Sequence, residues 1–265
     1  MSEYPQTWHY GLVARYWAEV LVDAPEIEFL SRSVEGRQPA LDVACGTGRL
    51  LIPLLERRLD VDGTDISPDM LDLCRARAER KGLAPNLYVQ ASHELDLPRR
   101  YRTIYMCGSF GIGGDADHDR VALRRLYDHL EPGGFLLLDH EMPYSEPTGW
   151  SYWTKQGREA LPETVEVHGW RPLSDGSEVA LSSRVVDVDP LTQRLVMEMR
   201  PHLRRDGEVI EEETLTLAMT LYTAKHIELL LEVAGFDDVR MVDNWTDAPA
   251  TRDTSNVVFI AQRPA

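Results

Sequence analysis

The stretch LDVACGTGRLL, residues 41–51, decides the fold of this chain. A short apolar run ends in a Gly-x-Gly turn, Gly46 to Gly48, and a helical pattern begins directly after it. Glycine at such a turn lets a ligand approach the backbone closely, because a side chain would occupy that space. Many nucleotide-binding folds share this pattern, so alone it is weak evidence. It predicts a strand, a turn and a helix, with a ligand at the turn.

Two carboxylates flank the turn in the sequence. Asp42 precedes it, and Asp65 stands at the end of the next predicted strand. Asp42 would repel a pyrophosphate and suits a ligand that carries a positive group, whereas Asp65 can accept hydrogen bonds from both hydroxyls of a ribose. A nicotinamide dinucleotide would also need a third glycine, where Leu51 stands. The combination favours a cationic nucleoside over a dinucleotide.

Strand-like and helix-like patterns alternate through the first half of the chain. We expect buried strands at 39–45, 60–66, 86–92, 102–108 and 134–141, and helices at 10–21, 24–33, 49–58, 67–82 and 118–134. A further helix at 223–236 and strands at 238–244 and 256–262 close the chain. This order predicts an α/β fold with a Rossmann-like, seven-stranded, mostly parallel sheet and helices on both faces.

The rhythm changes after Glu141. Residues 142–160 are rich in proline, glycine and aromatic residues, and four runs of period-2 character then follow up to residue 222. The turn sequences SDG, PLT and RDG separate these runs, which is typical of an antiparallel meander. We therefore expect a core domain of residues 1–141 and 223–265, with an antiparallel β insertion at 142–222, between the fifth and sixth strands, that shapes the substrate site.

Composition excludes several classes of function. The 265 residues include 28 Lys and Arg against 44 Asp and Glu, a formal net charge of −16, which argues against nucleic acid as a partner. The three cysteines are isolated and no Cys/His cluster suggests a metal site. The N-terminus lacks the pattern of a signal peptide, and the apolar runs are strand-sized, so we expect no membrane association and a cytoplasmic protein.

Three segments carry a resemblance to a known family. LDVACGTGR, residues 41–49, is similar to the first motif of the class I S-adenosylmethionine-dependent methyltransferases, and TDISPDML, residues 64–71, resembles their second. HLEPGGFLLLD, residues 129–139, resembles the segment that leads into their fifth strand. The resemblance covers about residues 8–141 and the final helix and strands. It implies S-adenosylmethionine as cofactor but no particular substrate.

The resemblance also implies roles for single residues. Gly46 and Gly48 would make room for the methionine part of the ligand, and Asp65 would hold the ribose. Backbone groups of Ala44 and Cys45 would contact the ligand, Ile66 and Met70 would flank the adenine, and Tyr16 would contact the methionine carboxylate, a task that Tyr10 or Arg15 could share. The predicted cofactor-binding set is Tyr10, Tyr16, Asp42, Ala44, Cys45, Gly46, Gly48, Asp65, Ile66, Met70, Ala91, Ser92 and Cys107.

This sequence departs from the family pattern at two positions. Ala91 stands where many relatives have an aspartate that binds the adenine amino group, which leaves that contact to backbone, Ser92 or Glu94. Arg102 stands where the fourth strand of relatives often begins with an aspartate. We expect weaker cofactor affinity, with the site retained.

Residues near the acceptor leave two interpretations open at each place. His140 follows the fifth strand and would be either a general base or a residue that only orients its neighbours. The aromatic residues Tyr144, Trp150, Trp153 and Trp170 would form either a substrate pocket or the core between insertion and domain. Arg184 would meet either an anionic substrate group or one of the many acids.

The sequence as a whole predicts an enzyme that transfers a methyl group from S-adenosylmethionine to an N, O or C atom of a small molecule. The alternatives are a protein of the same fold with a non-methylating or regulatory role, and a nicotinamide-dependent oxidoreductase. The antiparallel meander could lend an edge to a second subunit, so a homodimer stays an open alternative. The acceptor and the atom that is methylated do not follow from the sequence.

Overall fold

The computed structural model describes residues 4–164, 167 and 169–265. Its larger sheet has seven strands in the order β11-β12-β5-β4-β1-β2-β3. The strands β1 to β5 are parallel, while β12 runs antiparallel to both β5 and β11. The bounds of these strands are Ala40–Val43 (β1), Val61–Asp65 (β2), Leu87–Val89 (β3), Tyr101–Met106 (β4), Leu130–Glu141 (β5), Asp237–Asp243 (β11) and Asn256–Gln262 (β12).

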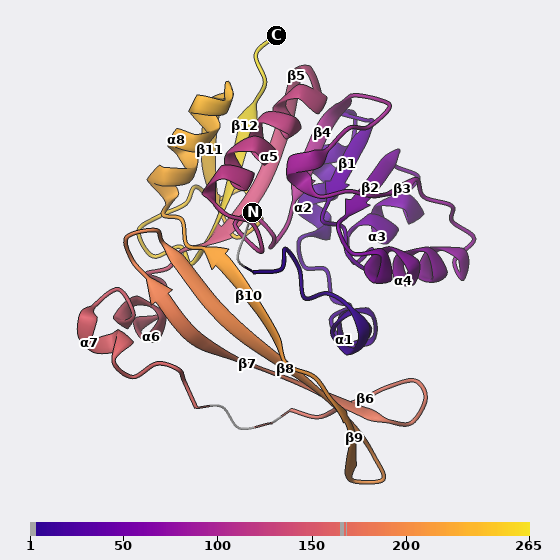
Figure 1. Ribbon diagram of the computed structural model, residues 1–265. Coiled ribbons are helices and arrows are strands. Elements are labelled where there is room, and N and C mark those ends of the chain that lie inside the picture. Colours follow the sequence, from indigo (N-terminus) through magenta and orange to yellow (C-terminus); the bar gives the residue numbers. More distant parts are fainter. Residues whose placement is uncertain (1–3, 165–166, 168) are drawn as a thin grey trace.

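Helices cover both faces of this sheet (Figure 1). One core cluster joins Leu41 and Val43 of β1 to the helices α5 and α8, and the other joins Ala40 to α2, α3 and α4. Alternate residues of a strand point to opposite faces, so a strand covered on both sides is apolar along most of its length. The helices are α1 (Gly11–Glu19), α2 (Ile27–Val34), α3 (Leu51–Glu56), α4 (Pro68–Glu79), the 3₁₀ turn η1 (Ser92–Glu94), α5 (Ala116–His129) and α8 (Ala224–Ala234).

A second, antiparallel sheet lies between β5 and α8 in the chain. Its strands follow the order β10-β8-β7-β6, and β9 pairs with β8. Two short helices precede it. The bounds of these elements are α6 (Pro147–Ser151), α7 (Lys155–Arg158), β6 (Arg171–Pro172), β7 (Glu178–Asp189), β8 (Arg194–Arg205), β9 (Glu208–Glu212) and β10 (Leu215–Thr220). The predicted fold class, a mostly parallel seven-stranded sheet with an antiparallel insertion, is confirmed.

The details of the insertion differ from the prediction. The last period-2 run is divided into β9 and β10, which pair with opposite halves of the long strand β8. The division falls at Pro201 of β8, which has no amide hydrogen to donate to a ladder. Of the first predicted run, residues 163–172, only Arg171–Pro172 is strand, and residues 165, 166 and 168 lie outside the described part.

One helix boundary also differs. We expected the helix of residues 118–134 to end at Pro-Gly-Gly, but α5 ends at His129 and β5 begins at Leu130. Residues 130–134 extend β5 because the final residues of the chain bind them: Gly133 N donates to Arg263 O, and Arg263 N donates to Gly134 O at 2.8 Å. No helix in the described residues is long and apolar enough to cross a membrane.

The insertion and α1 lie together at the carboxyl-terminal edge of the large sheet (Figure 1). Strand β10 binds the segment after β4, where Thr220 N donates to Gly111 O at 2.7 Å and Gly113 N donates to Ala218 O at 3.0 Å. Trp8 and Val13 pack against the apolar face of β8 and β10. Both contacts bring parts of the chain that are distant in sequence to the ends of strands β1, β2 and β4.

Ser67 is the N-cap of α4. Ser67 Oγ accepts a hydrogen bond from Met70 N at 3.3 Å and donates one to His9 O at 2.5 Å. The same hydroxyl therefore caps a helix and holds the segment before α1. Pro68 occupies the first turn, a position where proline is favoured because the amide hydrogen is not needed there.

Replacing Ser67 with alanine removes both hydrogen bonds from a fully buried position. We expect the free energy of unfolding to fall by about 1–2 kcal/mol, the range for a lost helix cap with a second buried partner. Urea unfolding measures it, with Ser255→Ala as the control because that side chain is exposed. Equal losses in the two variants would contradict the assigned role.

A cavity at the carboxyl ends of the strands

The glycine turn after β1 has a left-handed backbone. The φ angles are 58° at Ala44, 54° at Gly46 and 80° at Gly48, a region that favours glycine. A Cβ atom on Gly48 would lie 2.6 Å from Cys74 Sγ and 2.9 Å from Ile52 Cδ1, closer than atoms can approach. The turn therefore requires glycine at 48 because α4 packs directly against it.

Asp65, the last residue of β2, anchors the turn. Its Oδ2 accepts a hydrogen bond from Gly46 N at 2.9 Å, and its Oδ1 accepts one from Ser67 N at 2.8 Å. Burial raises the pKa of this carboxyl group, although the backbone donors oppose the increase. One carboxylate thus connects the turn after β1 with the turn after β2, and it lines the cavity described next.

Asp42 of β1 is buried and incompletely satisfied. Its side chain is 2% exposed, and Oδ2 has no hydrogen-bond partner. Burial raises the pKa of Asp42 to about 8, with the Tyr105 hydroxyl and the Arg49 guanidinium acting in the opposite direction. A buried carboxylate without a donor is rare in folded proteins, and beside a cavity it indicates that a ligand supplies the donor.

A cavity adjoins these groups at the ends of β1, β2, β3 and β4. Ten of the predicted cofactor-binding residues line it: Asp42, Ala44, Cys45, Gly46, Asp65, Ile66, Met70, Ala91, Ser92 and Cys107. Parallel sheets bind ligands at this edge, at the point where successive connections leave on opposite sides. Here β1 lies between β2 and β4 in the sheet, so the cavity occupies that point.

The other three members of the predicted set do not line the cavity. Gly48 contributes backbone conformation only. Tyr16 packs against Leu12, Leu173 and other apolar residues on the side of the insertion. Tyr10 is 41% exposed, and burial together with the neighbouring carboxylates of Asp69 and Asp65 raises its pKa.

Further residues reach the cavity that the sequence did not single out. Trp17, next to Tyr16 on α1, faces the cavity instead, since one residue along a helix turns the side chain by about 100°. The sequence offers a signal for Arg49, which ends the motif CGTGR, but none for the N-terminal segment. The lining residues that were missed include Gln6, Thr7, His9, Trp17, Leu21, Arg49, Gln90, His93, Met106, Gly108, Ser109, Phe110, Gly111, Ile112, Gly114, His118 and Asp119.

His140 lies behind the cavity wall. Its Nε2 accepts a hydrogen bond from Tyr222 N at 3.1 Å, and burial lowers the pKa of its imidazole to about 4. The ring is neutral at physiological pH and its acceptor nitrogen is occupied. This geometry fits the second of the two alternatives, a histidine that orients its neighbours.

The predicted substrate residues lie apart from the cavity. Tyr144, Trp150 and Trp153 contact one another around α6, with ring centroids 6.3 Å and 5.6 Å apart in successive pairs. Trp170 stacks against the Arg204 guanidinium, and Arg184 forms an ion pair with Glu198 at 2.9 Å. None of the five lines the cavity. Strand β10 of the insertion instead binds the segment after β4, and it is this segment that lines the cavity.

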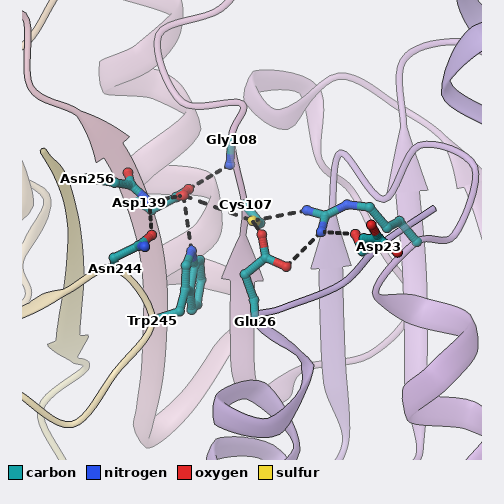
Figure 2. A network of polar contacts seen from close by, with 9 residues as sticks. Asp23, Glu26, Cys107, Gly108, Asp139, Asn244, Trp245 and Asn256 are labelled. Atoms are coloured by element: carbon teal, nitrogen blue, oxygen red, sulfur yellow. Dashed lines mark hydrogen bonds and ion pairs between the residues drawn. The ribbon is translucent and has the colours of Figure 1, made fainter. Parts of the chain in front are cut away.

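A polar network holds that segment in place (Figure 2). Asp139 of β5 accepts hydrogen bonds from Gly108 N at 2.6 Å, Trp245 Nε1 at 3.1 Å and Asn256 Nδ2 at 3.0 Å. On the other side, Arg49 donates to Glu26 at 2.7 Å and to Cys107 Sγ at 3.6 Å. The contacts of Asp139 and those of Arg49 together fix the backbone at the carboxyl end of β4, beside the cavity.

Part of the chain matches a known family of domains. A family model described as a methyltransferase domain matches residues 40–134, which include the glycine turn, Asp65 and the ends of β3 and β4. Residues 40–134 are therefore similar to the methyltransferase domain family, and the chain shares its fold with solved S-adenosylmethionine-dependent methyltransferases.

Individual relatives show how far the similarity extends. The ubiquinone/menaquinone biosynthesis C-methyltransferase UbiE of Brucella anthropi is 38% identical over 132 residues, 47% of this chain and 47% of that protein. The chain thus matches about half the length of this curated relative. A solved S-adenosylmethionine-dependent methyltransferase from Clostridium acetobutylicum is 18% identical, with a TM-score of 0.71 over 94% of this chain and 96% of that one.

A second solved structure, the sugar N-methyltransferase KedS8 from Streptoalloteichus, is 24% identical, with a TM-score of 0.66. The match covers 91% of this chain and 88% of that one. Both structural matches extend over nearly the whole chain, so the similarity of fold includes the insertion.

The requirement for glycine at position 48 can be tested by substitution. We expect Gly48→Ala to lower the free energy of unfolding by about 2–4 kcal/mol, from left-handed strain and the clash with Cys74. Gly82→Ala is the matched control, because Gly82 has φ 71° but open space around its Cβ position. It should lose about 1 kcal/mol from strain alone. Chemical denaturation measures both, and indistinguishable losses would contradict the clash.

Proposed function

We propose that the cavity binds S-adenosylmethionine and that the protein transfers its methyl group to an N, O or C atom of a small molecule. The observation that carries this proposal is the unpartnered, buried carboxylate of Asp42 beside a glycine turn held by Asp65. A ligand with both a cationic group and a ribose would supply a donor to Asp42 and hydroxyl groups to Asp65. The methyltransferase domain over residues 40–134 supports the same conclusion.

The residues present fit this cofactor group by group. Asp42 offers an acceptor to an ammonium group, and Asp65 can accept from ribose hydroxyls. Ile66 and Met70 line the cavity beyond Asp65 and would flank the adenine. A Cβ on Gly46 would lie 3.0 Å from Met70 Cε, so glycine there keeps the space between turn and side chain open. Ser92 lines the cavity near Ala91 and offers the adenine a hydroxyl partner.

The same features disfavour a nicotinamide dinucleotide. A pyrophosphate at the turn would stand against the two buried carboxylates, Asp42 and Asp65. Among the described residues that line the cavity, Arg49 is the only lysine or arginine, and its guanidinium donates to Glu26 and to Asp23 O. Charge therefore favours a cationic ligand.

In the bound state S-adenosylmethionine supplies a methyl group that its sulfonium already activates for displacement. The chain's own contribution is to orient the acceptor, which can lower a barrier by about 7–11 kcal/mol in well-aligned systems. Trp17, Phe110 and Ile112 give the cavity an apolar part that excludes water. The network around Asp139 keeps the segment after β4 at a fixed position beside the acceptor.

The features that fit the cofactor do not by themselves select one chemical class of methyl acceptor. The names of similar proteins include a C-methyltransferase and a sugar N-methyltransferase, and these describe those proteins. Retention of the cofactor without turnover on a broad panel of acceptors would favour the alternative of a regulatory, non-methylating protein. The exposed edge strand β9 would be the site for a second copy in a homodimer, which the mass in solution tests.

Calorimetry with S-adenosylhomocysteine tests the site directly. We expect wild-type protein to bind and Asp65→Asn to bind about 10–100-fold more weakly, because a charged hydrogen-bond acceptor contributes about 1.5–3 kcal/mol. Asp72→Asn, a 76% exposed acid on α4, should bind like the wild type. Absence of binding by the wild type would refute the proposal, and so would wild-type affinity in Asp65→Asn.

Binding should also release protons near neutral pH. The pKa of Asp42 is about 8 in the free cavity, and a bound ammonium favours the ionised form and lowers it. Affinity should therefore rise with pH up to about 8 and then level off. Calorimetry at pH 7 in buffers of different ionisation enthalpy measures the released protons. Asp42→Asn should bind more weakly with less proton release, and unchanged release would contradict the assignment.

A further inference from the structure

The cavity contains a third carboxylate, Asp119, that the nucleoside does not require. It lies in the second turn of α5 and is 7% exposed. Its Oδ2 accepts a hydrogen bond from the Tyr222 hydroxyl at 2.7 Å. Its Oδ1 has no hydrogen-bond partner in the described residues, although Asp119 lines the cavity. One oxygen is thus fixed in place while the other remains available to a ligand.

Asp119 belongs to the part of the cavity formed by the segment after β4. A Cβ on Gly114 would lie 3.6 Å from Asp119 Oδ1, so the carboxylate stands beside that segment. The Tyr222 ring stacks on Phe110, with centroids 5.3 Å apart. Tyr222 follows β10, the strand of the insertion that binds Gly111 and Gly113. The carboxylate is therefore positioned by α5, by the segment after β4 and by Tyr222, which follows β10.

The groups around Asp119 leave it able to change its charge near neutral pH. Burial raises its pKa to about 6, and Asp115, the N-cap of α5, acts in the same direction. The Tyr222 hydroxyl, Arg194 of β8 and His118 of α5 oppose the increase. The His93 ring of η1 lies against the His118 ring with centroids 4.2 Å apart, and the Tyr222 ring contacts His140 and His226. A carboxyl group with such a pKa suits proton transfer.

We propose that Asp119, oriented by Tyr222, binds the nucleophilic nitrogen of an amine acceptor and takes its proton. This inference rests on the proposed function and names the acceptor class. The ammonium N–H bond breaks, the proton forms an O–H bond on Asp119 Oδ1, and the electron pair remains on nitrogen. That pair then forms the bond to the methyl carbon while the sulfur–carbon bond breaks and its pair stays on sulfur. Asp119 returns its proton to water afterwards.

An amine is the acceptor that this corner recognises best. The ionised carboxylate attracts an ammonium group electrostatically, and Arg194 is engaged with Gly114 O. An alcohol would form a hydrogen bond but gain no charge pairing. An anionic acceptor would meet three carboxylates on the cavity wall.

The test is a titration of the Asp119 carboxyl by NMR on protein labelled with ¹³C at aspartate Cγ, both free and with S-adenosylhomocysteine. Asp119→Asn assigns the signal, and its midpoint should lie near pH 6. Methylammonium chloride should lower this midpoint by about half a pH unit or more, whereas methanol should not. Tyr222→Phe should raise it, because the charged form loses a donor. An ordinary midpoint near 3.9, or no response to methylammonium, would overturn the proposal.

Cofactor affinity separates this proposal from a role of Asp119 in holding the nucleoside. Asp119→Asn should bind S-adenosylhomocysteine within about twofold of the wild type, as should the control Asp117→Asn, whose side chain is 80% exposed. A loss in Asp119→Asn comparable to that of Asp65→Asn would place Asp119 on the nucleoside and overturn the proposal. Failure of the wild type to bind the nucleoside would instead refute the proposed function and leave the titration of the free protein interpretable.

Discussion

A buried carboxylate that the protein itself leaves incompletely paired is the constraint on which this site depends. Asp42 is enclosed between β2 and β4, and its Oδ2 lacks a hydrogen-bond partner. Burial of such a group is unfavourable unless a donor or a positive charge offsets the lost hydration. With a pKa of about 8, the Asp42 carboxyl group is mostly protonated in the free protein at neutral pH, and a cationic ligand would favour its ionised form. The same arrangement would disfavour an anionic ligand.

The rest of the site follows from where this strand ends. Parallel pairing of β1 with β2 and β4 brings the carboxyl ends of three strands together, and Asp65 connects the first two turns by binding Gly46 and Ser67. Asp139 fixes the turn after β4 in a similar way, because it accepts a hydrogen bond from Gly108 N. The insertion and the segment around Trp8 then pack over this edge and complete the cavity from outside.

The sequence was sufficient for the core and for much of the cavity at the strand ends because local rules govern both. The Gly-x-Gly turn, the apolar strands and the Ser67 cap can each be recognised from a few consecutive residues of the sequence. The turn residues and Asp65 follow from motif position alone. The remaining wall depends on contacts between distant segments: Trp17 lies on the cavity and Tyr16 does not, a difference of helix rotation set by packing against the insertion. Asp119 lies within a helical pattern that looks solvated in the sequence, and only its contact with Tyr222 reveals it.

For the aromatic residues of the insertion, the sequence leaves two interpretations open, a substrate pocket or a local core. Trp150 and Trp153 pack against each other around α6 and do not line the cavity. Arg184 is paired with Glu198 in the neighbouring strand, a contact that only the register of β7 and β8 determines. Residue type alone therefore does not distinguish a pocket wall from a local cluster in a β insertion.

The central claim is tested most directly by a crystal structure of the protein with S-adenosylhomocysteine. The account predicts electron density for the nucleoside in the cavity, with its amino group in contact with Asp42 and its ribose hydroxyls facing Asp65. Density for the nucleoside at another site, or an amino group bound by other residues while Asp42 remains without a partner, would contradict the account.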